Sequence, residues 1–144
     1  MSVIRGQRLE GGIYTAVQLW CTDPAAAKTQ YGPIASWDTS EITDMWCLFR
    51  DKANFNGDIS RWDVSSVTRI GGMFVRATSF NGDLSQWDVS KVRNMGDMLH
   101  GATSFTHQLG GAWSTSTAVK TWMFNNDCPG SIAGKTNDAD GTPR

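Results

Sequence analysis

The sequence predicts a repeat solenoid, in which about four short units of a single domain stack on one another. Tryptophans recur at intervals of 25, 25 and 26 residues, at Trp37, Trp62, Trp87 and Trp113. The residues around them repeat in the same register, and a unit this short cannot bury its apolar face without a neighbour. The 144 residues are the size of one domain.

Composition and charge describe a globular chain and exclude several classes of partner. Apolar residues make up 40% of the chain, more than a disordered protein contains. The formal net charge of −1 excludes the basic surface that nucleic acids or anionic membranes require. No apolar run approaches the roughly 20 residues of a membrane span.

Residues 1–12 are expected to be an N-terminal extension without a signal peptide. This leaves the compartment open: cytoplasmic by default, extracellular or organellar if the chain is processed.

A helical cap is expected at residues 13–32, because the end of a stack exposes apolar surface. Apolar residues recur there on one helix face: Ile13, Val17, Trp20 and Cys21. Thr22-Asp23-Pro24 provides an N-cap and a first-turn proline for a second short helix. Gly32-Pro33 ends that helix.

Residues 33–124 are expected to form the four units. A period near 25 lies in the range of leucine-rich-repeat coils, so each right-handed coil should contain a short strand and a second, compact leg. We expect strands at 33–37, 58–62 and 83–87, forming a parallel ladder on one face. The opposite leg, which contains Met73-Phe74 and its equivalents, is expected to form short helical or 3-10 turns.

Polar residues that recur in every unit are expected to be structural. An Asp that precedes a Ser by two positions can accept backbone N–H groups and close a turn; this applies to Asp38, Asp63 and Asp88. Asn56 and Asn81 are expected to bond the backbone of the next coil. Gly57 and Gly82 are expected to supply positive φ angles. The aromatic residues that close the units are Phe55, Phe80 and Phe105.

The tryptophan ladder has two interpretations. Rings that recur in every unit are expected to lie in the core or at its edge, whereas an exposed ladder could stack against a sugar or a peptide. Ile59 and Trp62 lie three positions apart, so they would face opposite sides of a regular strand unless a bulge intervenes.

Two consecutive units read FNGDISRWDVSSVTRIGGMF and FNGDLSQWDVSKVRNMGDML. This text resembles the BspA-like leucine-rich repeat family, which includes the mycoplasma-lipoprotein type repeat and is abundant in bacterial surface proteins and microalgae. The resemblance extends over about residues 13 to 136. It implies a leucine-rich-repeat-like solenoid with a protein-binding or adhesion role and no catalytic activity.

The C-terminal part departs from the repeat. Ser114 follows Trp113 where the other units have Asp, as expected for a capping unit. Residues 125–144 are expected to form a C-terminal cap and tail. From Ser131 onward the polar, Gly-containing chain is expected to be mobile or loosely docked.

No catalytic or metal-binding constellation is expected. Three cysteines without Cys-x-x-Cys spacing support neither zinc nor redox chemistry. A Cys21–Cys47 bridge is conceivable, although free thiols are favoured. The two histidines, His100 and His107, accompany no nucleophile, and His100 is expected at the surface. Residues 137–141 resemble only the start of a calcium loop. We therefore expect no enzyme, no cofactor and no metal.

The expected function is a non-enzymatic protein-binding or scaffolding module, for instance an accessory subunit that stabilises a larger assembly. The alternative is a cell-surface adhesion protein that binds protein or glycan through the strand face; glycan binding has no specific support. Residues that differ between coils should carry the information about a partner. Two patches are selected on this basis, Arg61 with Gln86 and Trp46 with Val75. Trp46 could instead cover the junction with the cap helix.

Overall fold

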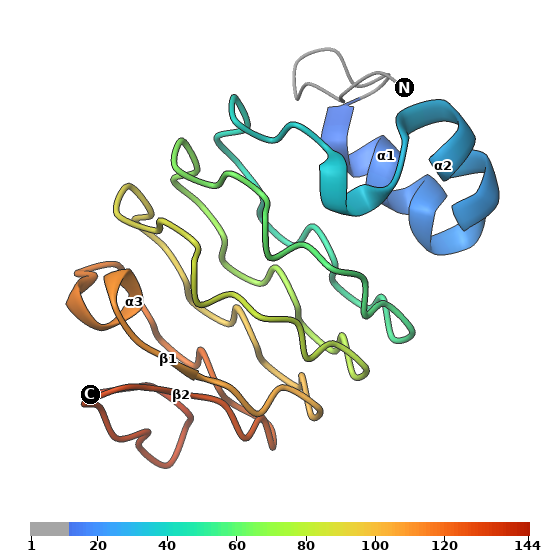
Figure 1. Ribbon diagram of the computed structural model, residues 1–144. Coiled ribbons are helices and arrows are strands. Elements are labelled where there is room, and N and C mark those ends of the chain that lie inside the picture. Colours follow the sequence, from blue (N-terminus) through green and yellow to red (C-terminus); the bar gives the residue numbers. More distant parts are fainter. Residues whose placement is uncertain (1–11) are drawn as a thin grey trace.

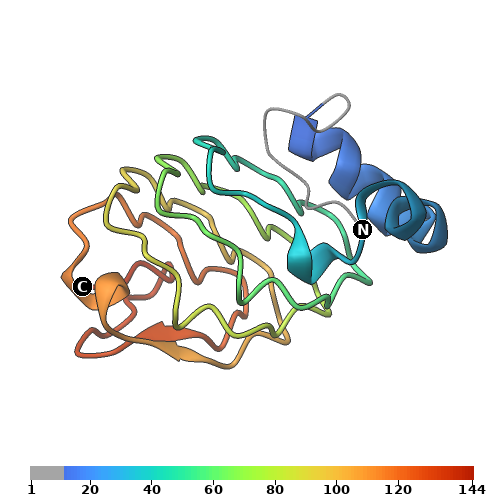
Figure 2. The ribbon, with the colours of Figure 1, turned by 45° about the horizontal axis from the view of Figure 1, so that its top comes forward.

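The computed structural model describes residues 12–144 as a stack of chain coils with two helices at one end (Figure 1). Helices α1 (Gly12–Thr22) and α2 (Pro24–Tyr31) are followed by a 3-10 turn, η2 (Ile34–Ser36). Successive coils run side by side toward the C-terminus in both views (Figures 1 and 2). Except for Gly12, the first residue of α1, the expected N-terminal extension lies outside the described residues.

The two helices lie where their spacing and capping residues predict them. Ile13 and Val17 of α1 are buried in the core. The Asp23 carboxylate accepts the Ala26 N–H at 3.1 Å as the N-cap of α2. Trp20 packs edge-on against Trp37, with 5.9 Å between ring centroids. The apolar face of α1 therefore covers the N-terminal end of the stack.

One leg of each coil carries a backbone ladder. Parallel bridges join Asp44, Arg69, Asn94 and Val119 in turn. Alternate N–H groups of this leg donate to carbonyls 24 residues ahead, as Met45 does to Arg69 (2.9 Å) and Phe49 to Met73 (2.8 Å). Tight turns lie within the same leg, because Leu48 also donates to the Met45 carbonyl (3.2 Å). Ladder and turns therefore share the leg in which only turns were expected.

The strands expected at 33–37, 58–62 and 83–87 are absent, and that prediction is wrong. Each segment contains a tight turn closed by the tryptophan N–H, as in Trp62 to Ile59 (3.1 Å). In such a turn, residues three apart face the same side, so Ile59 and Trp62 are both buried without a bulge. Within residues 12–144, the regular strands are β1 (Gln108–Leu109) and β2 (Ser131–Ile132), which pair in parallel.

The indole N–H groups replace the missing strand pairing. Trp62 Nε1 donates to the Ile34 carbonyl at 2.8 Å, and Trp87 Nε1 donates to the Ile59 carbonyl at 3.1 Å. Trp113 repeats the bond to the third coil, at 3.0 Å. Trp37, Trp62, Trp87 and Trp113 are at most 3% exposed. The buried interpretation of the tryptophan ladder is thus confirmed, and the exposed one is wrong.

The repeated Asp and Asn residues perform the structural roles predicted for them. Carboxylates accept the N–H two residues ahead at 3.0 Å at Asp38, Asp63 and Asp88. Asn56 Oδ1 accepts the N–H of Asn81 in the next coil, and Asn81 Oδ1 accepts that of Thr106, both at 3.0 Å. These bonds confirm that short polar side chains tie each coil to itself and to its neighbour.

The role predicted for Gly57 and Gly82 is wrong, because neither has a positive φ. A Cβ atom on Gly57 would lie 2.8 Å from Phe55 Cε1, and one on Gly82 would lie 2.7 Å from Phe80 Cε1. These glycines therefore make room for the phenylalanine rings. Left-handed backbone occurs instead in the ladder leg, where Cys47, Gly72, Asp97 and Trp122 have φ between 56° and 65°.

The C-terminal segment is docked, contrary to the mobile or loosely docked tail that was expected. After the short helix α3 (Ala112–Thr115), the last coil presents N–H groups with no further coil to accept them. Trp122 N–H donates to Thr142 Oγ1 (2.8 Å), and Phe124 N–H donates to the Gly141 carbonyl (2.9 Å). The tail takes the place of a fifth coil, which is why Thr142 is only 9% exposed.

Candidate functional site

The structure brings Trp46 and Val75 together in one hollow of about 270 Å³ on the ladder leg, here called the ladder groove. Besides these two residues, its lining includes Arg50, Arg76, Asp97 and His100. Trp46 is 39% exposed, but Val75 is buried at 8%, which corrects the expectation that Val75 is exposed. Arg61 and Gln86 are exposed at equivalent positions of neighbouring coils and do not line this groove.

The indole of Trp46 lies over the second coil. A Cβ atom on Gly71 would come within 2.4 Å of Trp46 Cζ3, so glycine provides the space that the ring occupies. The Arg69 guanidinium lies 4.7 Å from the ring centroid, within the range of a cation–π contact, and also pairs with Asp44 at 3.1 Å. The ring is therefore held in one orientation at the groove edge.

The junction with the cap involves the backbone of Trp46. The Tyr14 hydroxyl donates to the Trp46 carbonyl at 2.6 Å. In an internal coil, the equivalent carbonyl accepts a ladder N–H from the preceding coil. Burial, followed by the nearby Asp44 charge, raises the pKa of Tyr14 to about 12. The hydroxyl thus remains a donor at neutral pH. This bond joins the cap helix to the backbone of the first coil at Trp46.

Charged groups surround the apolar floor of the ladder groove. Arg76 binds Asp51 through two bonds of 2.5 and 3.1 Å, while Arg50 lies 3.6 Å from the same carboxylate. The bonds from Arg76 lower the pKa of Asp51. Across the groove, Asp97 Oδ1 lies 3.5 Å from His100 Nδ1. Two guanidinium groups therefore share one carboxylate, which leaves Arg50 with donors available to a ligand.

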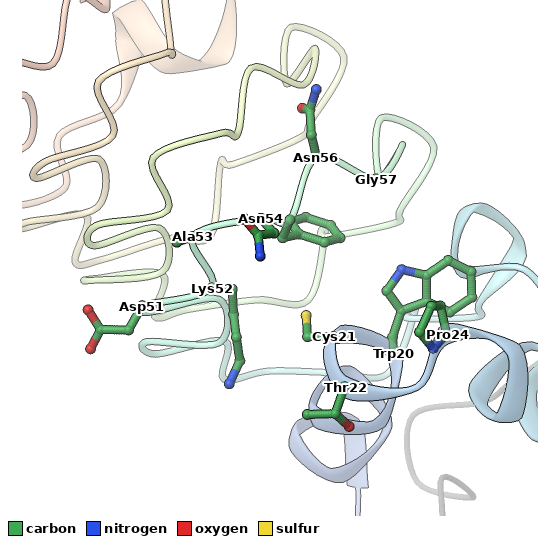
Figure 3. Close-up of a pocket in the computed structure, with 11 residues that line it drawn as sticks. Trp20, Cys21, Thr22, Pro24, Asp51, Lys52, Ala53, Asn54, Asn56 and Gly57 are labelled. Carbon is green, nitrogen blue, oxygen red and sulfur yellow. The ribbon is translucent and has the colours of Figure 1, made fainter.

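A second hollow of about 470 Å³, here called the end pocket, lies between the helices and the first coil (Figure 3). Trp20, Cys21 and Thr22 line it from the helical side, and Asn54 and Asn56 line it from the coil (Figure 3). Phe55 belongs to the same lining. Lys52 Nζ donates to Gln18 Oε1 at 2.5 Å and links the coil side of the pocket to α1.

The remaining reactive groups of residues 12–144 do not assemble into a metal site or a disulfide. All three cysteines are free, and burial raises the pKa of Cys128 to about 11. Within residues 12–144, no three His, Cys, Asp or Glu side chains are grouped so that they could share a metal ion. In the segment that resembles a calcium loop, Asp138 accepts N–H groups from Asp140 and Thr142.

No helix in the described part of the chain combines the length and apolar character needed to cross a membrane.

Sequence reasoning missed several residues that shape the two hollows. Aligning the coils places Arg50 and His100 at the same repeat position as Val75, but the search for apolar anchors selects only Val75 there. Arg69 and Tyr14 have no such signal, because their roles depend on the ring of Trp46 and on the docking of α1. The end pocket also has no such signal, because it forms where the helices do not fill the space beside the first coil.

Neither a curated protein nor a solved structure matches this chain. A family model described as "Mycoplasma protein of unknown function, DUF285" matches residues 22–129. The match begins at the end of α1, includes the four tryptophan-centred coils and ends just before β2. Because it extends over more than half of the sequence, the chain belongs to the DUF285 family.

Proposed function

We propose that this chain is a non-enzymatic protein-binding module, built as a capped repeat solenoid of the leucine-rich-repeat-like, BspA-like kind. Its support is the ladder that joins residues one coil apart, together with the structural role of the residues that recur in every coil. The repeated Trp, Asp, Asn and Phe side chains stack or bond within the coils. Of the coil-variable residues, Trp46, Arg61 and Gln86 are exposed and available for recognition.

The observation that carries the proposal is the exposed indole of Trp46 beside the ladder groove. Tryptophan and arginine are enriched among the residues that dominate binding energy in protein interfaces. Here Trp46 is 39% exposed, and the groove beside it contains Arg50 and Arg76. Arg50 can donate to a partner carboxylate, and Val75 provides an apolar contact at the base. A protein surface with an apolar side chain next to an acidic one fits this arrangement.

Affinity capture from an extract of the source organism, quantified by mass spectrometry, tests this proposal with matched variants. Trp46→Ala and Arg50→Glu should each remove the captured partner. Trp122→Ala should not, although Trp122 is the more exposed of these two tryptophans of the ladder leg (47% against 39%). Co-purification with a larger assembly would identify the module as an accessory or scaffolding subunit.

Thermal unfolding of each variant separates binding from stability. Trp46→Ala should cost less than the ~3–5 kcal/mol of a buried aromatic truncation. If it costs that much, or if capture is unchanged in both groove variants, the ladder groove is not the binding surface. Arg61→Glu tests the second predicted patch: loss of capture in this variant alone would move the interface to the corner that carries Arg61 and Gln86.

A further inference from the structure

Neighbouring coils recognise each other through the same pair of contacts at successive junctions. The rings of Phe55 and Phe80 stack with centroids 5.9 Å apart, and those of Phe80 and Phe105 stack at 6.0 Å. The residue after each ring adds a hydrogen bond, from the N–H of the later coil to the side-chain oxygen of the earlier coil. Asn81 N–H donates to Asn56 Oδ1 and Thr106 N–H donates to Asn81 Oδ1, both at 3.0 Å.

In the first coil no preceding coil supplies these two contacts, although Phe55 itself is only 6% exposed, so most of its ring is already covered. Among the described residues, the ring contacts of Phe55 are with Phe49 in its own coil and with Phe80 in the next one. No oxygen of residues 12–144 accepts the N–H of Asn56. The end pocket lies at this position, because Phe55 and Asn56 both line it.

The two ends of the stack differ in this respect. At the C-terminal end, Thr142 and Gly141 accept the N–H groups of Trp122 and Phe124 that a further coil would have accepted. At the N-terminal end, Tyr14 replaces one ladder bond. The helices leave a hollow of about 470 Å³ between Trp20 and the coil, with Asn56 on its far side (Figure 3).

We propose that the end pocket is a docking slot for a segment of a protein partner in which an aromatic residue is followed by Asn. The partner's ring would occupy the hollow that Trp20 and Phe55 line, and its Asn side-chain oxygen would accept the Asn56 N–H. This continues the interface that already joins the coils, in which Phe80-Asn81 and Phe105-Thr106 follow Phe55-Asn56. The slot goes beyond the proposed function, since it is a separate hollow from the ladder groove and requires a defined ligand sequence.

A synthetic peptide with the sequence of residues 77–87, which contains Phe80-Asn81, is the probe. It is titrated into the ¹⁵N-labelled full chain and followed by NMR. The expected result is saturable binding, with the largest amide shift at Asn56. The peptide variant Asn81→Ala should bind at least fivefold more weakly, because it lacks the acceptor. The peptide variant Phe80→Ala should not bind measurably.

Two variants of the full chain provide a matched comparison. Thr22 and Thr29 are both exposed helical residues whose hydroxyls donate to the carbonyl four residues earlier, at 2.8 and 3.0 Å. Only Thr22 lines the end pocket. Thr22→Trp should block the peptide, and Thr29→Trp should bind it as the wild type does, with both variants keeping the wild-type melting profile.

Failure of this inference is distinguishable from failure of the proposed function. Trp46→Ala should leave peptide binding unchanged. Equal binding to Thr22→Trp, equal binding of the Phe80→Ala peptide, or no shift at Asn56 would each overturn the slot. Protection of the Asn56 amide from solvent exchange in the free chain would also overturn it. Concentration-independent protection would assign the site to another segment of the same chain, and concentration-dependent protection to a second copy.

Discussion

Replacing Trp87 by Phe tests whether the indole N–H groups hold the coils together. Trp87 is 2% exposed, and its Nε1 donates to the Ile59 carbonyl of the preceding coil at 3.1 Å. Phenylalanine keeps an aromatic ring but lacks this donor. The carbonyl of Ile59 would then be buried without its side-chain partner.

The expected loss has two parts. Losing this hydrogen bond costs about 0.5–1.5 kcal/mol, because the Ile59 carbonyl still accepts the backbone N–H of Trp62. The smaller ring leaves a cavity of roughly 40 Å³, which at about 24 cal/mol per Å³ adds about 1 kcal/mol. The free energy of unfolding should therefore fall by about 1.5–2.5 kcal/mol, a sizeable share of the about 5–15 kcal/mol by which proteins are stable.

Urea unfolding followed by fluorescence and circular dichroism measures this loss, provided that the dependence on denaturant is unchanged. Trp122→Phe is the control, because Trp122 is 47% exposed and its Nε1 bond to Asp140 lies at the surface; its cost should stay within about 0.5 kcal/mol. Replacing the Trp87 indole by benzothiophene, which keeps the shape and removes the donor, isolates the hydrogen bond. A loss below about 0.5 kcal/mol in Trp87→Phe would refute the role assigned to the indole.

Three further predictions concern the coils and their C-terminal end. Gly82→Ala should lower the free energy of unfolding by about 1–3 kcal/mol, because the new Cβ meets the stacked Phe80 ring at 2.7 Å; Gly110→Ala, whose Cβ has 3.8 Å of clearance, is the control in the same urea assay. Thr142→Val should cost about 1–2 kcal/mol and accelerate hydrogen exchange at the Trp122 amide, whereas Thr142→Ser should restore both. The pKa is lowered at Asp58, Asp83 and Asp88 by hydrogen bonds from the serine two residues ahead. The bond from the serine hydroxyl contributes most, and the bond from the serine N–H comes second. Since the unfolded pKa is about 3.9, this stabilisation is present above about pH 4 and is lost as the pH falls further. A urea midpoint that stayed constant down to pH 2 would contradict it.

Several elements could be predicted because they depend on residues close together in the chain. The spacing of Ile13 and Val17 and the Asp23-Pro24 pair determine the two helices. Asp63 bonds the backbone only two residues away, so the sequence alone identifies its turn. Asn56 bonds Asn81, which lies far along the chain, but the 25-residue period places the two side by side. Repetition makes a distant contact predictable.

Other elements could not be predicted from spacing. The period of 25 does not say which leg carries the backbone ladder. The indole N–H of Trp62 makes the inter-coil bond in the tryptophan leg, which leaves the backbone free to turn. The role of Gly82 was misassigned because the ring of Phe80 folds back over it, a contact that composition does not show.

The sequence by itself determined the number of coils, their register and the side chains that join them, because stacking identical units requires identical residues at fixed intervals. Only the tertiary structure decided which variable residues remain exposed. Val75 is covered and Trp46 is not, because exposure depends on the neighbouring coil and on the docking of α1. The docked tail and the open end pocket have the same cause. Each depends on what lies next to the first or the last coil, where no neighbouring coil is stacked. The 25-residue period does not specify what lies there.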